Sequence, residues 1–189
     1  MKDLITELFK NDEENNNLRL YILKQFVSQV MTDRERANLW GLPEGCRIRE
    51  NSKIISPEKF VCGSHVWIGE HCILDASGGL EIGDHTTIGF SYIWSHSSIM
   101  ANIMYSNYPG NEFIRRRKTV IGKGCYISGP VVVYPGITIG DQCAILPMSV
   151  VTQDVPNLSI VSGNPGKVIK TMDEAYIQRK IEEIRRETI

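Results

Sequence analysis

Four histidines are the side chains in this sequence with the clearest capacity for acid–base chemistry. A neutral imidazole can accept a proton from a hydroxyl or an amine near neutral pH, and it can also bind a metal ion. His65, His71 and His85 each lie three residues after an apolar residue of a repeat described below, where we expect them to face outward. His96 lies in Trp94-Ser-His-Ser-Ser98, where the repeat stops and a long insertion begins. Its position therefore sets His96 apart from the other three.

The five cysteines are a second group of reactive side chains. They form no Cys-X-X-Cys pair and are odd in number, which fits neither a zinc ribbon nor a disulfide framework. Most of them occupy positions of the repeat that we expect to face the interior, so we interpret them as small buried hydrophobic residues. They are Cys46, Cys62, Cys72, Cys125 and Cys143.

The composition is that of one folded domain with an appendage. The chain has 189 residues, 42% of them hydrophobic, and its 21 Lys and Arg nearly balance its 22 Asp and Glu. A net charge of −1 gives no general attraction to nucleic acid or to an anionic membrane. No apolar run approaches the ~20 residues of a membrane span, and the start Met1-Lys-Asp3 does not resemble a signal peptide. We therefore expect a soluble, cytoplasmic protein.

A six-residue repeat governs the middle of the chain. From Ile121 onward an apolar residue recurs every six positions, often with Gly after it. An α-helix cannot use this period, because successive apolar residues would move around its surface by ~240° each time. A chain that turns a corner every six residues does fit, since three sides close a triangular coil of about 18 residues whose turns pair as short parallel strands. The repeat predicts that Ile121 lies over Ile139, Ile127 over Ile145 and Val133 over Val151.

An earlier block keeps this period with two interruptions. Two extra residues within Ala76–Gly79 mark a bulge or a corner. The repeat is interrupted after Trp94, which indicates that Ser98–Lys118 leave the coil as a long loop. Such loops are usually functional. The apolar positions of this block are Cys62, Ile68, Leu74, Ile82, Ile88 and Trp94.

Helical patterns flank the repeat. Asn16–Leu39 has apolar residues at helical spacing, and Thr171-Met-Asp-Glu174 has the sequence of a capping box before a further apolar stripe. We therefore divide the chain into three parts. Residues 1–45 form an N-terminal helical segment, residues 46–170 form the β-helix with a protruding loop at 98–118, and residues 171–189 form a C-terminal helix.

The repeat resembles that of the hexapeptide-repeat acyltransferases. Val120-Ile-Gly-Lys-Gly-Cys-Tyr-Ile-Ser-Gly129 and Val133–Asp141 are similar to the family's repeat, and Ser149–Pro156 and Ile160–Lys170 are similar to its closing signature. The Asn-Pro-Gly-Lys tail resembles that of acetyl-CoA-using sugar acetyltransferases, including galactoside, maltose and polysaccharide O-acetyltransferases. The resemblance covers roughly residues 60–171. It implies a mainly β fold, a left-handed parallel β-helix, and a homotrimer that uses acetyl-CoA and no metal ion.

The resemblance also implies roles for individual residues. In similar enzymes a histidine at the position of His96 faces a cleft between subunits, where it would act as general base for a sugar hydroxyl attacking the thioester. The backbone N–H of Gly129 would then stabilise the oxyanion. Asp75, Asp84 and Glu112 are unranked candidates for the group that orients His96. The cofactor-binding residues carried over by position are Tyr126, Gly129, Pro147, Gln153, Lys167 and Lys170.

Arg115-Arg-Arg-Lys118 is the strongest basic run in the sequence. Guanidinium groups suit phosphate, which would lie either on coenzyme A or on a phosphorylated or nucleotide-linked acceptor. A solvated loop end is the alternative interpretation, and the sequence does not decide between them. Because the net charge is close to zero, we do not expect nucleic acid as a partner.

These observations favour an acetyl-CoA-dependent O-acetyltransferase that acts on a sugar or a glycan precursor. An N-acetyltransferase on an amino sugar and an antibiotic acetyltransferase have the same fold, and the sequence does not separate them. A zinc hydrolyase of the carbonic anhydrase type would need three histidines at one metal ion, yet His65 and His71 are six residues apart, on adjacent faces of the coil. A non-enzymatic scaffold would leave His96 and the Asn-Pro-Gly-Lys tail unexplained.

Overall fold

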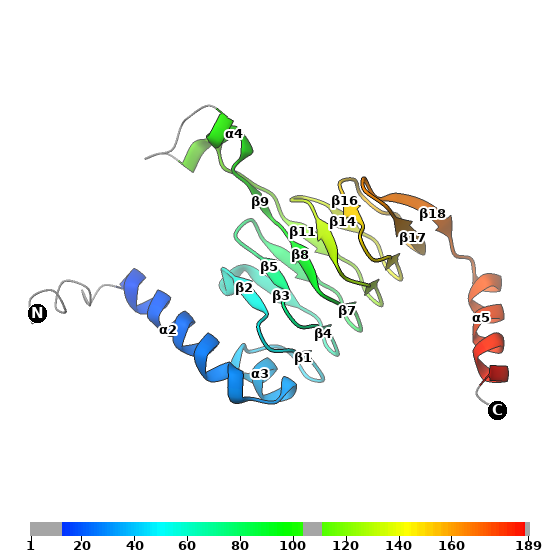
Figure 1. The fold of residues 1–189 in the computed structure, drawn as a ribbon, viewed down its shortest axis with the longest axis horizontal. Coiled ribbons are helices and arrows are strands. Elements are labelled where there is room, and N and C mark those ends of the chain that lie inside the picture. The colour runs from blue at the N-terminus through cyan, green and yellow to red at the C-terminus, as the bar shows by residue number, and fades with distance from the viewer. Residues whose placement is uncertain (1–12, 104–110, 188–189) are drawn as a thin grey trace, which may run out of the picture.

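The computed structural model describes residues 13–103 and 111–187, and a stack of short parallel strands forms most of it (Figure 1). Helices α2 (Glu13–Val27) and α3 (Asp33–Leu39), joined by the single-turn helix η1 (Ser28–Val30), precede the stack. Helix α5 (Glu174–Glu187) follows it. No helix within the described ranges is long and apolar enough to cross a membrane.

Three sheets form the walls of the coil. Sheet 1 contains β1 (Arg47–Ile48), β4 (Trp67–Ile68), β7 (Thr87–Ile88), β12 (Tyr126–Ile127), β15 (Ala144–Ile145), β17 (Ser159–Ser162) and β18 (Lys167–Thr171), with β18 antiparallel to β17. Sheet 2 contains β2 (Lys53–Ile55), β5 (Ile73–Asp75), β8 (Ser91–Ile93), β13 (Val131–Val133) and β16 (Val150–Val151). Sheet 3 contains β3 (Phe60–Cys62), which follows the short helix η2 (Pro57–Lys59), and β6 (Leu80–Ile82), β11 (Thr119–Ile121) and β14 (Thr138–Ile139).

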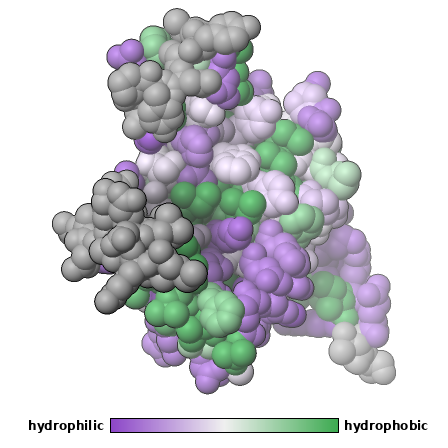
Figure 2. Space-filling model, turned by 60° about the vertical axis from the view of Figure 1, so that its left-hand side comes forward, coloured by the Kyte–Doolittle hydropathy of each residue, from purple (hydrophilic) through white to green (hydrophobic). Residues whose placement is uncertain are grey.

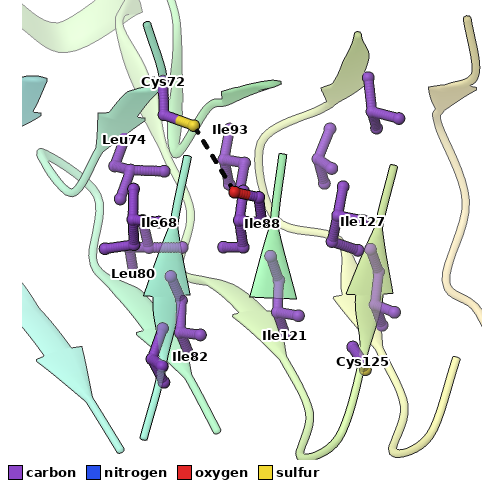
Figure 3. Close-up of a cluster of buried hydrophobic side chains, with 14 of the residues drawn as sticks. Ile68, Cys72, Leu74, Leu80, Ile82, Ile88, Ile93, Ile121, Cys125 and Ile127 are labelled. Atoms are coloured by element: carbon purple, nitrogen blue, oxygen red, sulfur yellow. Dashed lines mark hydrogen bonds between the residues drawn. The ribbon is translucent and has the colours of Figure 1, made fainter. Parts of the chain in front are cut away.

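The apolar residues of the repeat form a continuous interior column. Ile121 is in register with Ile139, Ile127 with Ile145, and Val133 with Val151. All six side chains are at most 1% exposed. Figure 3 shows side chains of this kind from successive strands pointing into the same interior. The predicted stacking and the mainly β, parallel β-helical fold of hexapeptide repeats are therefore confirmed.

The cysteines belong to this core, as predicted. All five are free, four of them are buried, and Cys62 is half-buried. The thiol of Cys72 donates to the carbonyl of Gly89 at 3.1 Å and makes a longer contact of 4.0 Å with that of Ile88 (Figure 3). Burial raises the pKa of the Cys72 thiol to about 11. A thiol with a raised pKa is a poor nucleophile, so packing accounts for this residue.

The repeat predicts one interior residue wrongly, by a single position. It places Trp94 inside, but Ile93 is the fully buried residue, in register with Leu74 and Val133, and Trp94 is half-buried on the outside. The corner at Phe90 is one residue shorter than the period requires. In an extended strand a one-residue shift moves every side chain to the opposite face. This shift is what turns Trp94 outward, two residues before His96.

The other three histidines lie at corners of the coil. His65, His71 and His85 each have a backbone φ of 57°, in the left-handed region that is uncommon for residues other than glycine. All three are exposed, which confirms their predicted outward orientation. The rings of His65 and His85 stack, with centroids 4.9 Å apart.

The terminal helices differ from the sequence predictions at their caps. The predicted single helix over Asn16–Leu39 is broken, because Thr32 and Glu35 form a capping box that begins α3. At the other end Thr171 ends β18 instead of capping a helix. Asp173 caps α5, with its Oδ1 accepting the N–H of Tyr176 at 2.6 Å.

The long loop leaves the coil at the corner between sheets 2 and 3. Strands β9 (His96–Ser97) and β10 (Arg115–Arg116) pair antiparallel at its base. Helices α4 (Ile99–Ile103) and η3 (Asn111–Phe113) lie beyond this ribbon. Figure 1 shows α4 projecting away from the coil. The loop therefore begins and ends beside His96.

Candidate active site

His96 is held at the base of the loop by a buried carboxylate. Its ring Nδ1 lies 2.6 Å from Oδ2 of Asp75, and its backbone N–H donates to the same oxygen at 3.1 Å. The His96 side chain is 33% exposed, whereas that of Asp75 is fully buried. The ring of Trp94 meets the imidazole edge-on, with centroids 6.2 Å apart. One nitrogen of the imidazole is thus fixed, and the ring remains partly open to solvent.

The corner after β5 is built around Asp75. Its Oδ2 accepts the N–H of Ser95 at 2.9 Å, and its Oδ1 accepts the N–H of Ser77 at 3.0 Å. The hydroxyl of Ser77 lies 3.1 Å from Nδ1 of His96. Gly78 permits this close packing, because a Cβ there would lie 2.1 Å from the carbonyl oxygen of Ser95. The two extra residues that interrupt the repeat therefore close the corner over the carboxylate.

These contacts keep Asp75 ionised and fix the tautomer of His96. Burial alone would raise the pKa of Asp75, but hydrogen bonds from the backbone of Ser95 and Ser77 and from the His96 side chain outweigh it and lower the pKa to about 2. An ionised carboxylate only accepts hydrogen bonds. Nδ1 of His96 must therefore carry a proton, and in the neutral imidazole this leaves the lone pair on Nε2. This is the arrangement that a general base requires.

The same contacts predict an acid-sensitive contribution to stability. Because the folded-state pKa of Asp75 lies below its ordinary value of 3.8, the ionised carboxylate stabilises the fold above about pH 4, and this contribution is lost as the pH falls through about 2. A shift of this size corresponds to about 2 kcal/mol in the free energy of unfolding. Urea unfolding of the wild type and of Asp75→Asn, at about pH 5 and about pH 2, should show the stability difference shrinking by about that amount. A difference that does not change with pH would contradict this assignment.

The other two candidates for orienting His96 lie elsewhere. Oδ1 of Asp84 accepts the N–H of Ser64 at 2.9 Å, and its Oδ2 lies 3.4 Å from the ammonium of Lys123. Glu112 is exposed in η3. Of the three candidates that the sequence left unranked, Asp75 alone contacts the imidazole.

Gly129 lies at the corner between sheets 1 and 2, one turn beyond Phe90. A Cβ on Gly129 would lie 1.9 Å from the carbonyl oxygen of Phe90, so only glycine fits there. Within the described part of the chain its backbone N–H donates to no acceptor. His96 is at the opposite end of the sheet 2 wall. The structure therefore does not bring Gly129 and His96 of one chain together.

Three of the residues carried over for coenzyme binding share one wall. Tyr126 of β12 and Lys170 of β18 belong to one outward row of sheet 1, linked through the registers of β15 and β17. Both side chains are exposed, as is that of Lys167 on the same strand as Lys170. The ammonium of Lys170 lies 3.6 Å from the ring centroid of Tyr176 in α5.

The remaining two lie at different corners. Pro147 is exposed at the corner between sheets 1 and 2, where the next residue, Met148, donates its N–H to the carbonyl of Pro130 at 2.7 Å. This puts Pro147 one turn beyond Gly129. Gln153 is exposed at the corner between sheets 2 and 3, on the side of the coil where His96 lies. The predicted set is thus divided between two corners and one wall.

The described residues contain no group of three or more His, Cys, Asp or Glu side chains arranged to hold a metal ion. His65 and His85 stack at one corner and His71 lies at another, 3.2 Å from a carboxylate oxygen of Glu70.

Curated proteins with similar sequences are acetyltransferases. The chain is 31% identical over 123 residues to WcaF of Escherichia coli, named as a colanic acid biosynthesis acetyltransferase, covering 65% of this chain and 64% of that protein. It is 30% identical over 135 residues to the galactoside O-acetyltransferase of the same organism, covering 67% of this chain and 64% of that protein. The chain thus spans less than two thirds of the length of these relatives. No family model matches it.

Solved structures have the same fold over most of the chain. A maltose O-acetyltransferase from Clostridium difficile matches with a TM-score of 0.70 at 25% identity, covering 87% of this chain and 91% of that one. A hexapeptide-repeat acetyltransferase from Vibrio cholerae, solved with acetyl coenzyme A, matches with a TM-score of 0.66 at 24% identity and covers 88% and 92%. In its six-residue repeat, its parallel β-helix and its sequence, the chain is similar to the hexapeptide-repeat acetyltransferases.

Proposed function

We propose that this protein transfers the acetyl group of acetyl-CoA to a hydroxyl of a sugar or glycan precursor, with His96 as the general base. The observation that carries the proposal is the buried Asp75 carboxylate on Nδ1 of His96, which leaves a lone pair on Nε2 of a partly exposed ring. WcaF is named for colanic acid biosynthesis, and we infer polysaccharide biosynthesis as the setting of this protein. The five free thiols support action in the reducing cytoplasm.

The proposed reaction uses the open nitrogen of His96 twice. Nε2 takes the proton of the acceptor hydroxyl as its oxygen attacks the thioester carbonyl carbon, giving a tetrahedral oxyanion. When the carbon–sulfur bond breaks, Nε2–H returns the proton to the leaving thiolate of coenzyme A. Asp75 stays ionised throughout and stabilises the transient imidazolium. The products are the acetyl ester of the sugar and free coenzyme A.

We propose that a homotrimer completes the site. Gly129 and His96 of one chain lie at opposite corners of sheet 2, so the free N–H of Gly129 serves an oxyanion beside His96 of another copy. If three coils turn sheet 2 toward a common axis, the Gly129 corner of each meets the His96 corner of its neighbour. The two corners lie at nearly the same height, because β8 and β13 are adjacent strands, about 4.8 Å apart.

The outer face of sheet 2 supports this arrangement. Its central outward row is apolar in all but one position, and the apolar members are half-buried on the single chain. Figure 2 shows hydrophobic side chains gathered on the coil face between the two larger grey segments. A contiguous apolar face on a folded chain is typical of a protein–protein interface. The row consists of Lys53, Ile73, Tyr92, Val132 and Val150.

Replacing Val132 with lysine should dissociate the trimer. The charge would enter an apolar shared surface without a partner, so we expect the mass in sedimentation to fall to that of one chain and acetyl transfer to be lost. Val120→Lys is the matched control, since Val120 is a half-buried valine on the outer face of sheet 3. We expect that variant to keep the mass and the activity of the wild type. A wild-type protein that sediments as one chain would overturn the trimer.

Acetyl-CoA would lie between two subunits, with its thioester at His96. We propose that the pantetheine arm contacts Pro147 and Tyr126 and that Lys167 and Lys170 hold phosphates, because these exposed side chains follow the coil from the Gly129 corner toward its C-terminal end. Gln153 lies at the facing corner, so it would reach the coenzyme from the neighbouring subunit.

The product decides between O- and N-acetylation. Wild-type protein with acetyl-CoA is offered neutral sugars, nucleotide-linked sugars and amino sugars, and the product is examined by proton NMR. We expect an acetyl ester, whose chemical shift and lability to mild base distinguish it from an amide. An amide formed on an amino sugar would show that the acceptor is an amine instead of a hydroxyl. Acetyl transfer from acetyl-CoA would still hold. A protein that binds no coenzyme A would contradict the proposed function as a whole.

A further inference from the structure

Three arginines at the base of the loop lie beside His96 and have no part in the reaction described above. Arg116 of β10 is the register partner of His96 in β9, and Arg115 is the partner of Ser97. Partners in an antiparallel pair project from the same face of the ribbon, with Cβ atoms roughly 4.5–5.5 Å apart. Arg116 therefore leaves the ribbon on the same face as the imidazole.

Arg117 is anchored at the same corner. Its backbone N–H donates to the carbonyl of Ser95 at 2.8 Å, directly before His96. Its aliphatic stem packs against Gly136, where a Cβ would lie 2.8 Å from the Cβ of Arg117. The guanidinium end of a side chain with a fixed stem remains close to the corner.

The positive charge of this cluster has no carboxylate partner among the described residues. Within residues 13–103 and 111–187, none of the three guanidinium groups has a carboxylate within 4.0 Å, and all three residues are exposed. The next residue in the run differs, since the ammonium of Lys118 lies 2.5 Å from Oε2 of Glu81. Asp75, the carboxylate that contacts His96, is buried and held by its own hydrogen bonds. The cluster is therefore free to bind an anion.

We propose that the acceptor is an anionic sugar, and that Arg116 binds its phosphate or carboxylate while a hydroxyl of the same molecule reaches Nε2 of His96. Guanidinium groups bind both kinds of oxyanion through paired N–H donors. The phosphates of coenzyme A are the other possible ligand. They lie at the far end of the coenzyme from the thioester, whereas Arg116 is the register partner of the proton-accepting histidine. This inference rests on the proposed function and names its substrate class.

Binding measurements test the inference without depending on turnover. Calorimetry compares glucose 1-phosphate, UDP-glucose and glucuronic acid with neutral methyl glucoside, on wild type, Arg116→Gln and Arg116→Lys. We expect Arg116→Gln to lose roughly ten- to a hundredfold in affinity for the anionic sugar that the wild type binds, and Arg116→Lys to lose less. Binding of glucose 1-phosphate or UDP-glucose would identify the anion as a phosphate, and binding of glucuronic acid would identify it as a carboxylate. Arg34→Gln, at an exposed position of α3, removes the same charge away from His96 and should behave as the wild type.

The outcomes separate the inference from the proposed function. If the wild type binds no anionic sugar more tightly than methyl glucoside, or acetylates neutral sugars best, the inference is overturned while acetyl transfer stands. If Arg116→Gln loses affinity for coenzyme A and not for the anionic sugar, the cluster serves the coenzyme and the inference is also overturned. If no sugar is acetylated but an anionic sugar binds through Arg116, the inference stands and the proposed reaction fails.

Discussion

Replacing His96 with alanine is expected to lower kcat for acetyl transfer by about 10²–10⁴-fold. The imidazole is the group that removes the hydroxyl proton, and a short hydrogen bond to a fully buried carboxylate directs its lone pair outward. The affinity for coenzyme A should not change, since the residues proposed to hold the coenzyme lie on the sheet 1 wall and at other corner positions. Thiol release from acetyl-CoA measures the first quantity and calorimetry with coenzyme A measures the second.

The control for this variant is another exposed histidine of the coil. His71→Asn changes a histidine at a corner with a φ of 57°, which asparagine tolerates, and should keep wild-type kcat. Turnover that survives unchanged in His96→Ala would remove His96 from the mechanism. Equal losses in both variants would indicate that damage to the coil, not loss of the base, lowers the rate.

Asp75→Asn is expected to lower kcat by about 10²-fold or more with little change in the KM for acetyl-CoA. Asparagine has nearly the shape of aspartate but carries no charge, so Nδ1 loses the acceptor that fixes its proton, and the imidazolium formed in the reaction loses its counter-ion. Asp75 touches no substrate and acts through His96 as a positioning residue. A separation of kcat from KM distinguishes that role from a general loss of folding.

Two comparisons strengthen the test of Asp75. Asp84→Asn is the matched control, because Asp84 also accepts a backbone N–H at a coil corner but contacts no candidate catalytic group. The double variant His96→Ala with Asp75→Asn should be about as slow as His96→Ala alone, since both changes remove one function. Additive losses in the double variant would show that Asp75 acts independently of His96.

The sequence predicts the coil well because its interior repeats. Each turn places an aliphatic residue such as Ile127 or Ile145 at an equivalent inward position, so a period in the sequence becomes a column in space. The outward orientation of His65 and the burial of Cys125 follow from the same period. The pairing of strands that are far apart in the chain can thus be predicted from the sequence, which is unusual for a sheet.

What the period cannot predict is a corner of different length. The short corner at Phe90 moves Ile93 into the core and Trp94 out of it, and no residue type in the sequence marks that change. The sequence leaves Asp75 as one of three candidates for the residue that orients His96, although its position in the repeat favours it. It follows Leu74 directly, one turn before Ser95, so a carboxylate there meets the backbone that leads into His96.

The relation between His96 and Gly129 could not be read from one chain for a physical reason. A triangular coil separates its corners by a full wall, and our account joins these two residues through the packing of neighbouring copies. Such packing depends on the whole outer face of sheet 2 and leaves no periodic signal. The arginines of β10 are a similar case, because only the register of the ribbon shows that Arg116 faces His96.

The most direct measurement is acceptor-dependent thiol release from acetyl-CoA, with wild type and His96→Ala side by side and coenzyme A binding measured on the same preparations. We predict turnover by the wild type that requires a sugar acceptor, and loss of that turnover in His96→Ala with coenzyme A still bound. Equal turnover by both proteins, or a wild type that binds no coenzyme A, would contradict a histidine-based acetyl transfer.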